Sequence, residues 1–183
     1  NLLDQFMYDD THFKLSLSET SRIDFYKVDL KVEGHLAGTT IDQLWECLTS
    51  KRAFIELTSK KQVKKKTGDQ HGLRSQKILV LDLERLAPVV QIFDDIGLNI
   101  LDDHEEDRPL WSLASIDAEQ FKGLPIEFSI SDRLKEIQQQ MLGLTPHVAQ
   151  EVPKAVQATL RSYQVEGIGW LERLRYMHLN GIL

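Results

Sequence analysis

The sequence predicts an α+β protein: a small accessory domain of antiparallel strands and helices, a connector punctuated by prolines, and a terminal helix that opens a further unit. Three observations support this class. Residues 12–32 alternate apolar and polar side chains with period two, which is typical of half-buried strands. Residues 41–48 and 83–97 repeat apolar side chains at helical spacing. Three of the five prolines fall between residues 121 and 159.

Composition indicates a soluble globular protein. Hydrophobic residues make up 42% and charged residues 27% of the 183 residues, values that argue against a disordered or collagen-like chain. The single cysteine, Cys47, allows no intrachain disulfide, so we expect a reducing, cytoplasmic location. No apolar run approaches the roughly 20 residues that span a bilayer, so no membrane partner is expected. The six histidines include no pair four residues apart, so no metal site is expected.

The first predicted motif is an antiparallel hairpin. Residues 12–17 and 23–32 form its strands, and the polar stretch 18–22 forms its turn. A short amphipathic helix is expected next, because Thr39 or Thr40 can supply its N-cap. The apolar face of that helix consists of Ile41, Leu44, Trp45 and Leu48.

Cys47 lies inside this predicted helix. A buried, inert thiol is therefore a better interpretation than a catalytic nucleophile. No glycine-x-serine-x-glycine motif is present either, so no catalytic residue is assigned.

Two further strands and a helix follow. Residues 53–57 and 77–82 are expected to pair with each other. Residues 83–97 return to helical period, with Pro88 near the first turn and Gly97 as the C-cap. These elements complete the predicted accessory domain.

The connection between the two strands carries a concentrated positive charge. Nine basic residues stand against two acidic ones between residues 51 and 77, although the whole chain has a net charge of −6. Two interpretations stay open. The segment could meet a phosphate backbone or an acidic partner, or it could be a solvated hairpin tip. The candidate nucleic-acid-binding residues are Lys60, Lys61, Lys64, Lys65, Lys66 and Arg74.

Two other conspicuous features are interpreted as structural. The acidic run at 102–108 could be taken for a metal cluster, but consecutive residues rarely converge on one ion, so a surface loop is expected. The three tryptophans are expected in the core rather than as stacking platforms: Trp45, Trp111 and Trp170.

The predicted domains are an α+β accessory domain at 1–120, a connector at 121–159 and a third unit at 160–183. Within the connector, a short helix begins after Ser131 and ends before Gly143. The prolines of the connector favour extended segments over a continuous helix.

The terminal segment forms a helix with one apolar face. Tyr163, Gly167, Trp170, Leu171, Leu174 and Met177 recur at helical spacing. A helical glycine costs about 0.5 to 1 kcal/mol against alanine, so Gly167 is expected where another backbone comes close. The helix is expected to stop at Asn180-Gly181, and Ile182-Leu183 then look like the start of a buried parallel strand.

The spacing Leu160-Arg161-x-Tyr163-Gln164-x-x-Gly167-x-x-Trp170-Leu171, followed by Gly181-Ile182-Leu183, resembles the entry to the ATPase core of the Swi/Snf (switch/sucrose non-fermenting) family of helicase-like DNA translocases. In that family the segment is the Q-motif region, and it leads into a RecA-like α/β core with a Walker-type phosphate-binding loop. The upstream unit and connector are similar, more loosely, to the region before the core in bacterial members. The resemblance implies a fragment that stops before this loop.

The resemblance also implies roles for two residues. Gln164 would pair its amide with the adenine edge of ATP, and Arg161 would place its guanidinium near the base or ribose. The alternative interpretation is that Gln164 caps the helix or faces solvent. ATP and Mg²⁺ would serve the parent protein, and none is expected on this fragment, because charge neutralisation at the γ-phosphate needs groups that it does not contain.

Two functional hypotheses result. In the first, the chain is the accessory fragment of an ATP-dependent translocase, a helicase-like hydrolase that moves on double-stranded DNA or remodels protein–DNA complexes. Its partners are then double-stranded DNA and the missing ATPase core, and the accessory domain restrains or steers the motor. In the second, the chain is a non-catalytic nucleic-acid- or protein-binding module that uses the basic hairpin at 51–77. The fragment alone is expected to be inactive as an enzyme.

Overall fold

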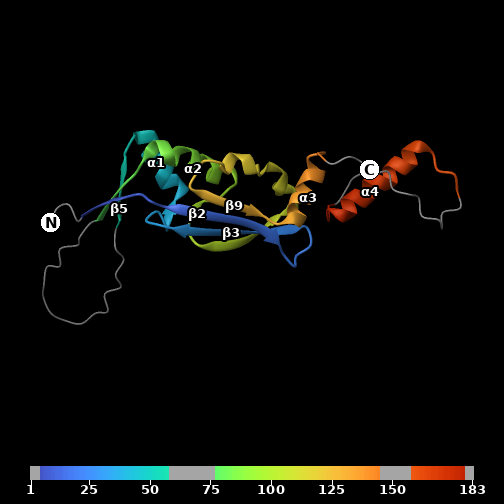
Figure 1. The fold of residues 1–183 in the computed structure, drawn as a ribbon, viewed down its shortest axis with the longest axis horizontal. Helices are drawn as coiled ribbons and strands as arrows, with labels where there is room; N and C mark the ends of the chain where they lie inside the picture. The colour runs from blue at the N-terminus through green and yellow to red at the C-terminus, as the bar shows by residue number, and fades with distance from the viewer. Residues whose placement is uncertain (1–4, 58–76, 145–157, 180–183) are drawn as a thin grey trace. The chain divides into compact units, whose positions relative to one another are not determined.

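A computed structural model describes residues 5–57, 77–144 and 158–179, and mixes strands with helices (Figure 1). The strands are Phe6–Tyr8 (β1), His12–Glu19 (β2), Phe25–Glu33 (β3), Thr39–Thr40 (β4), Phe54–Leu57 (β5), Lys77–Val80 (β6), Ile100–Leu101 (β7), His104–Pro109 (β8) and Ile126–Ile130 (β9). The helices are Ile41–Ser50 (α1), Leu83–Asp95 (α2), Asp132–Met141 (α3) and Ser162–Tyr176 (α4), with 3₁₀ helices at Leu110–Ser115 (η2) and Ala118–Phe121 (η3).

The chain forms two compact units. Unit 1 consists of Asn1–Lys14, Leu30–Asp103 and Glu119–Glu127. Unit 2 consists of Leu15–Asp29, His104–Ala118 and Phe128–Leu183. The domain boundaries expected after residues 120 and 159 stay a prediction.

The predicted helix α1 lies in unit 1. Thr40 is its N-cap and accepts a hydrogen bond from the Gln43 backbone, while the Gln43 side chain accepts one from the Thr40 backbone. This reciprocal pair satisfies two backbone donors that a helix start would otherwise leave open. Ile41, Leu44 and Cys47 are buried, so the expectation of a buried thiol is confirmed.

Helix α2 packs against α1 and begins after Asp82, whose carboxylate accepts from the Arg85 backbone. Gly97 has a φ of 74° directly after the C-cap Ile96, as the sequence predicted. Pro88 was expected near the first turn but lies deeper inside the helix, where its ring is exposed. An exposed position leaves room for the local distortion that a proline ring causes.

A three-stranded sheet of order β1-β6-β5 also belongs to unit 1. The antiparallel pairing of β5 with β6 confirms the prediction for residues 53–57 and 77–82. Strand β1 pairs with β6 in parallel, which the sequence did not indicate. A strand of three residues is too short to display an alternating pattern.

A four-stranded sheet has the order β8-β3-β2-β9. Strands β2 and β3 are neighbours and confirm the predicted hairpin. Strand β9 lies beside β2, although residues 126–130 fall in the region predicted as a connector.

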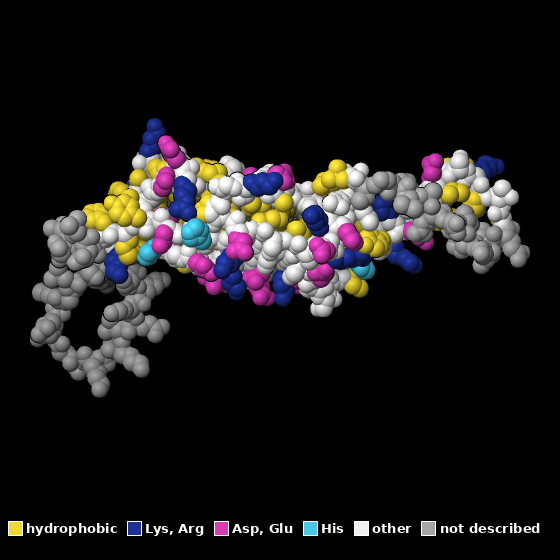
Figure 2. All heavy atoms as spheres, in the orientation of Figure 1, with side chains coloured by type: hydrophobic (Ala, Val, Ile, Leu, Met, Phe, Trp, Pro, Cys, Tyr) yellow, Lys and Arg dark blue, Asp and Glu magenta, His cyan; other side chains and the backbone are white. Residues whose placement is uncertain are grey.

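The sequence predicted a surface loop at 102–108, and this prediction is wrong. Most of the acidic run forms the edge strand β8. Two acidic side chains of β8 pair with basic groups: Lys27 with Glu105 at 3.0 Å and Arg22 with Asp107 at 3.4 Å. Lys27 belongs to the neighbouring strand β3, and opposite charges on neighbouring strands stabilise their pairing. The alternation of apolar and polar residues could not have revealed such a strand. Acidic and basic side chains intermingle over the face shown in Figure 2 rather than forming a patch of one sign.

The tryptophan prediction is wrong for Trp111, which is 69% exposed in η2. Trp45 and Trp170 are half-buried. The indole N–H of Trp45 donates to Asp94 on α2 at 3.1 Å. Over the described ranges, no helix has both the length and the apolar character that a membrane span requires.

Candidate nucleotide-binding helix and basic segment

The two residues predicted to contact a nucleotide lie at the start of α4. Arg161 is the N-cap, with extended backbone angles, and Gln164 is the third helical residue. The Gln164 Oε1 atom accepts a hydrogen bond from the Arg161 backbone N–H at 2.9 Å. Both side chains are exposed. Gln164 therefore has the capping role that the sequence left as the alternative, and its exposed amide is held at a defined place.

The apolar face of α4 is covered only in part in the described chain, since Gly167, Trp170 and Leu174 are half-buried. Tyr163 is 59% and Leu171 48% exposed, and Gly169 is the residue of this helix that is buried. A methyl group built on Gly167 meets no heavy atom within 4 Å. The expected close approach of another backbone to Gly167 is thus not seen here.

Helix α4 ends at Tyr176, earlier than the predicted stop at Asn180-Gly181. His178 takes the left-handed conformation, with a φ of 54°, that glycine usually supplies after a helix. The N–H of His178 bonds to the Arg175 carbonyl, and that of Leu179 bonds to the Leu174 carbonyl. This pair of bonds is a Schellman ending, and histidine tolerates the required φ better than most residues. The strand predicted at Ile182-Leu183 lies outside the described residues.

The last turn of α4 contacts α3 through a cluster that the sequence analysis missed, which we call the Tyr176 clamp: Arg133, Glu136 and Tyr176. The Arg133 guanidinium lies 3.8 Å from the centre of the Tyr176 ring, and its Nη2 donates to the Tyr176 carbonyl at 3.0 Å. The Tyr176 hydroxyl donates to Glu136 at 2.8 Å. That hydrogen bond raises the pKa of Tyr176. The only sequence signal was the three-residue spacing of Arg133 and Glu136, which places them on one helix face.

A cavity of about 240 Å³ lies beside the clamp within unit 2. It is lined by the turn between β2 and β3, by α3 and by His178. Its charged lining groups are of both signs: Glu19, Arg22, Asp24 and Arg133. This balance favours no particular ion.

The basic segment is described only at its edges. Lys51, Arg52 and Lys77 are exposed. Arg52 donates to the Cys47 sulfur at 3.7 Å and lies 3.6 Å from Glu46. The six candidate nucleic-acid-binding residues lie outside the described residues: Lys60, Lys61, Lys64, Lys65, Lys66 and Arg74.

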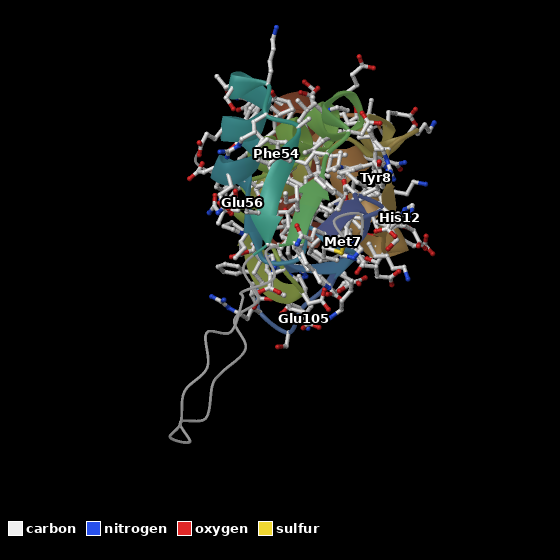
Figure 3. All side chains as sticks on the ribbon, turned by 90° about the vertical axis from the view of Figure 1, so that its left-hand side faces the viewer. Met7, Tyr8, His12, Phe54, Glu56 and Glu105 are labelled. Atoms are coloured by element: carbon white, nitrogen blue, oxygen red, sulfur yellow. The ribbon has the colours of Figure 1, made fainter. Side chains whose placement is uncertain are left out.

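The sheet that this segment joins has an exposed aromatic face, which the sequence analysis also missed. The register pairs Tyr8 and Phe54 with Val80, and residues paired in this way point to the same side of the sheet. Phe6 lies two residues before Tyr8 and therefore shares that side. Tyr8 is 77% exposed, and Phe6 and Phe54 are exposed as well. Figure 3 shows Tyr8 on β1 and Phe54 on β5.

In the part of the chain that the structure describes, no group of three or more His, Cys, Asp or Glu side chains could hold a metal ion.

Comparison with known proteins relates part of the chain to one class, the Snf2-like ATPases. A stretch of 63 residues, 34% of this chain, is 43% identical to the TATA-binding protein-associated factor MOT1 of Saccharomyces cerevisiae, a Swi2/Snf2-family ATPase. The match covers 3% of the length of MOT1, so the relationship is general and loose. No family model and no solved structure matches the chain.

Proposed function

We propose that this chain is the accessory region and first helix of an ATP-dependent, Swi/Snf-like DNA translocase. In this proposal α4 opens a RecA-like ATPase core, and the complete protein is a cytoplasmic hydrolase that uses ATP and Mg²⁺ to move on double-stranded DNA or to remodel protein–DNA complexes. The match to MOT1 supports the general relationship. The observation that carries the proposal is the exposed Gln164 amide, held at the start of α4 by its bond to Arg161.

The chemistry of an amide suits an adenine. A glutamine side chain can form two hydrogen bonds to the amino group and the neighbouring ring nitrogen of adenine, and such a pair discriminates by about 1 to 3 kcal/mol. The carbonyl oxygen of Gln164 has two lone pairs, so it can accept from Arg161 and from the adenine amino group together. The capping bond then limits the rotation of the amide before the nucleotide arrives. Arg161 adds a guanidinium at the same helix end.

The test is ATP hydrolysis by the full-length protein with and without double-stranded DNA. We expect DNA to stimulate turnover, and Gln164→Ala to raise the KM for ATP by about tenfold with a smaller effect on kcat, as expected for the loss of a bidentate base contact. Gln43→Ala is the matched control, because Gln43 makes the same capping bond to Thr40 on α1. The control should leave KM unchanged.

Either of two results would contradict this proposal. One is an ATPase that responds neither to DNA nor to Gln164→Ala. The other is an equal loss in Gln164→Ala and Gln43→Ala, because a lost helix cap would then explain the whole effect.

A second candidate function is a binding module for nucleic acid, and the aromatic face of the β1-β6-β5 sheet favours it. Exposed rings beside a basic segment are the combination with which proteins bind single strands, by stacking on bases and by contacting phosphates. The basic residues belong to the segment that joins β5 to β6. Binding should fall steeply with salt, and changing Lys64, Lys65 and Lys66 to glutamate should abolish it. Binding that survives both changes would exclude the segment.

A further inference from the structure

In the described part of the chain, the polar contacts of α4 with another element lie at its last turn. The side-chain hydrogen bonds that join it to another element there both involve Tyr176, one to Arg133 and one to Glu136. Met177, the next residue, is 5% exposed. Arg161 and Gln164, at the other end, are exposed. The anchored end of the helix is therefore opposite the end that carries the candidate adenine-binding amide.

Arg133 makes two different contacts with one residue. Its guanidinium stacks on the Tyr176 ring and also donates to the Tyr176 carbonyl oxygen. A planar guanidinium with five N–H donors can do both at once, whereas a lysine ammonium is a compact point charge. The carbonyl groups of a helix end have no intrahelical partner and carry a partial negative charge, so a cation there is favourable. Arg133 thus fixes both the ring and the backbone of the last turn.

Helix α3, which carries Arg133 and Glu136, is itself anchored by a cap and by buried side chains. Helix α3 begins with a Ser131 cap, and its Leu134 and Ile137 side chains are buried. Arg133 and Glu136 lie three residues apart and so project from one face. Glu136 accepts from the Tyr176 hydroxyl, which prevents the ring from turning away from the guanidinium.

Because α4 is long, a small tilt of the helix at the Tyr176 clamp moves Gln164 by a larger distance. Gln164 precedes Tyr176 by twelve residues, which is about 18 Å at a rise of 1.5 Å per residue. A tilt of about 10° at the anchored end would move the amide by about 3 Å. A misplacement of about 1 Å can already cost about 100-fold when groups must meet a ligand in a fixed geometry.

We propose that Arg133 is a positioning residue for nucleotide binding: with Glu136 it fixes the direction of α4 and thereby the place of Gln164. This inference rests on the proposed function of Gln164. It assigns to α3, an element outside the nucleotide-contacting segment, an influence on affinity for ATP that acts through α4.

The first experiment measures amide hydrogen exchange along α4 in this chain, without nucleotide. Arg133→Met should raise exchange in α4 by about 5- to 10-fold, because the stacking contact and the bond to the carbonyl are lost together. Tyr176→Phe, which removes only the hydroxyl bond, and Arg133→Lys, which keeps the charge, should give smaller increases. Arg22→Met is the matched control, because Arg22 also stacks on a ring, that of Phe25 at 3.9 Å. Unchanged exchange in Arg133→Met would overturn the anchoring role.

The second experiment measures KM and kcat for ATP in the full-length protein. Arg133→Met should raise KM by about tenfold with little change in kcat, Arg133→Lys should restore part of the affinity, and Arg22→Met should match the wild type. A loosened α4 with an unchanged KM would overturn the positioning role while leaving the role of Gln164 intact. Absence of ATP binding in the wild type would instead refute the proposed function, and with it the positioning role, while the exchange experiment would still decide the anchoring.

Discussion

Helices α1 and α4 begin and end with the same kinds of capping interaction, but their side chains are buried to different degrees. Each has a glutamine at its third position that accepts from the N-cap backbone, Gln43 in α1 and Gln164 in α4. Each is followed by a residue other than glycine in the left-handed conformation, Lys51 and His178, both with a φ of 54°. Yet α1 buries three residues against its surroundings, and within α4 only Gly169 is buried.

The comparison separates two requirements for a helix. Capping residues and the spacing of apolar side chains decide where a helix begins and ends, and both depend on a few neighbouring residues. Burial supplies most of the stability of a helix in a protein, and it depends on what lies opposite. For α1 that partner is α2. For α4, a polar clamp at the last turn accompanies an apolar face that is only partly covered in the described chain.

The largest effect that would test this difference comes from leucine truncation. Leu44 on α1 is fully buried, so Leu44→Ala should lower the free energy of unfolding by about 2 to 5 kcal/mol. Leu171 on α4 is 48% exposed, so Leu171→Ala should cost no more than about 0.5 kcal/mol. Denaturant unfolding of both variants measures the difference between the two losses of unfolding free energy. Equal losses would mean that α4 is packed as tightly as α1.

A glycine gives the second test. Gly167→Ala should stabilise α4 by about 0.5 to 1 kcal/mol, because alanine favours the helix and its methyl group would meet no atom within 4 Å. Circular dichroism of this chain during unfolding measures the change. Gly143→Ala is the control and should destabilise, since Gly143 has a φ of 69°. Destabilisation by Gly167→Ala would contradict the open surroundings of this residue.

The same variant also tests the parent protein that the proposed function implies. If the proposed function holds, and Gly167→Ala stabilises this chain but impairs ATP hydrolysis by the proposed parent protein, the result would indicate that another backbone packs against Gly167 there. That outcome would recover the reason for a helical glycine that the sequence suggested.

The elements predicted correctly from the sequence had local signals. The hairpin of β2 and β3 alternates over a long stretch, and α1 and α2 each combine a cap with helical spacing. The strands that were missed lacked such signals. Strand β1 has three residues, and β8 is acidic, with Glu105 paired to Lys27 of the neighbouring β3. A pairing between distant segments leaves little trace in either segment alone.

The candidate site also combines residues that the sequence could predict with contacts that it could not. Gln164 and Arg161 could be selected because they belong to a motif with fixed spacing, and the capping bond of Gln164 follows from its position three residues after the N-cap. The Tyr176 clamp could not be predicted, because Arg133 and Tyr176 are 43 residues apart and meet only after folding. The aromatic face was missed because it needs the register of three strands.

The smallest predicted effect is the pH dependence of the contact between Tyr176 and Glu136. The hydrogen bond to Glu136, and to a lesser degree burial, raise the pKa of Tyr176 above its ordinary value near 10. A raised pKa in the folded state means that the stabilisation is complete below about pH 10 and is lost as the pH rises through the folded-state pKa. Difference absorbance between the wild type and Tyr176→Phe should show this titration, and Glu136→Ala should move it to lower pH.

Two tryptophans report the two helices separately. Trp45 lies on α1 and Trp170 on α4. In two variants, Trp111 and one of these two tryptophans are replaced by phenylalanine. The fluorescence of the remaining tryptophan then reports on one helix alone. We expect the Trp170 signal to change as Tyr176 ionises, because a tyrosinate can no longer donate to Glu136, while the Trp45 signal stays constant over that range. A Trp170 signal that changes only together with that of Trp45 would mean that global unfolding, not release of the clamp, frees α4.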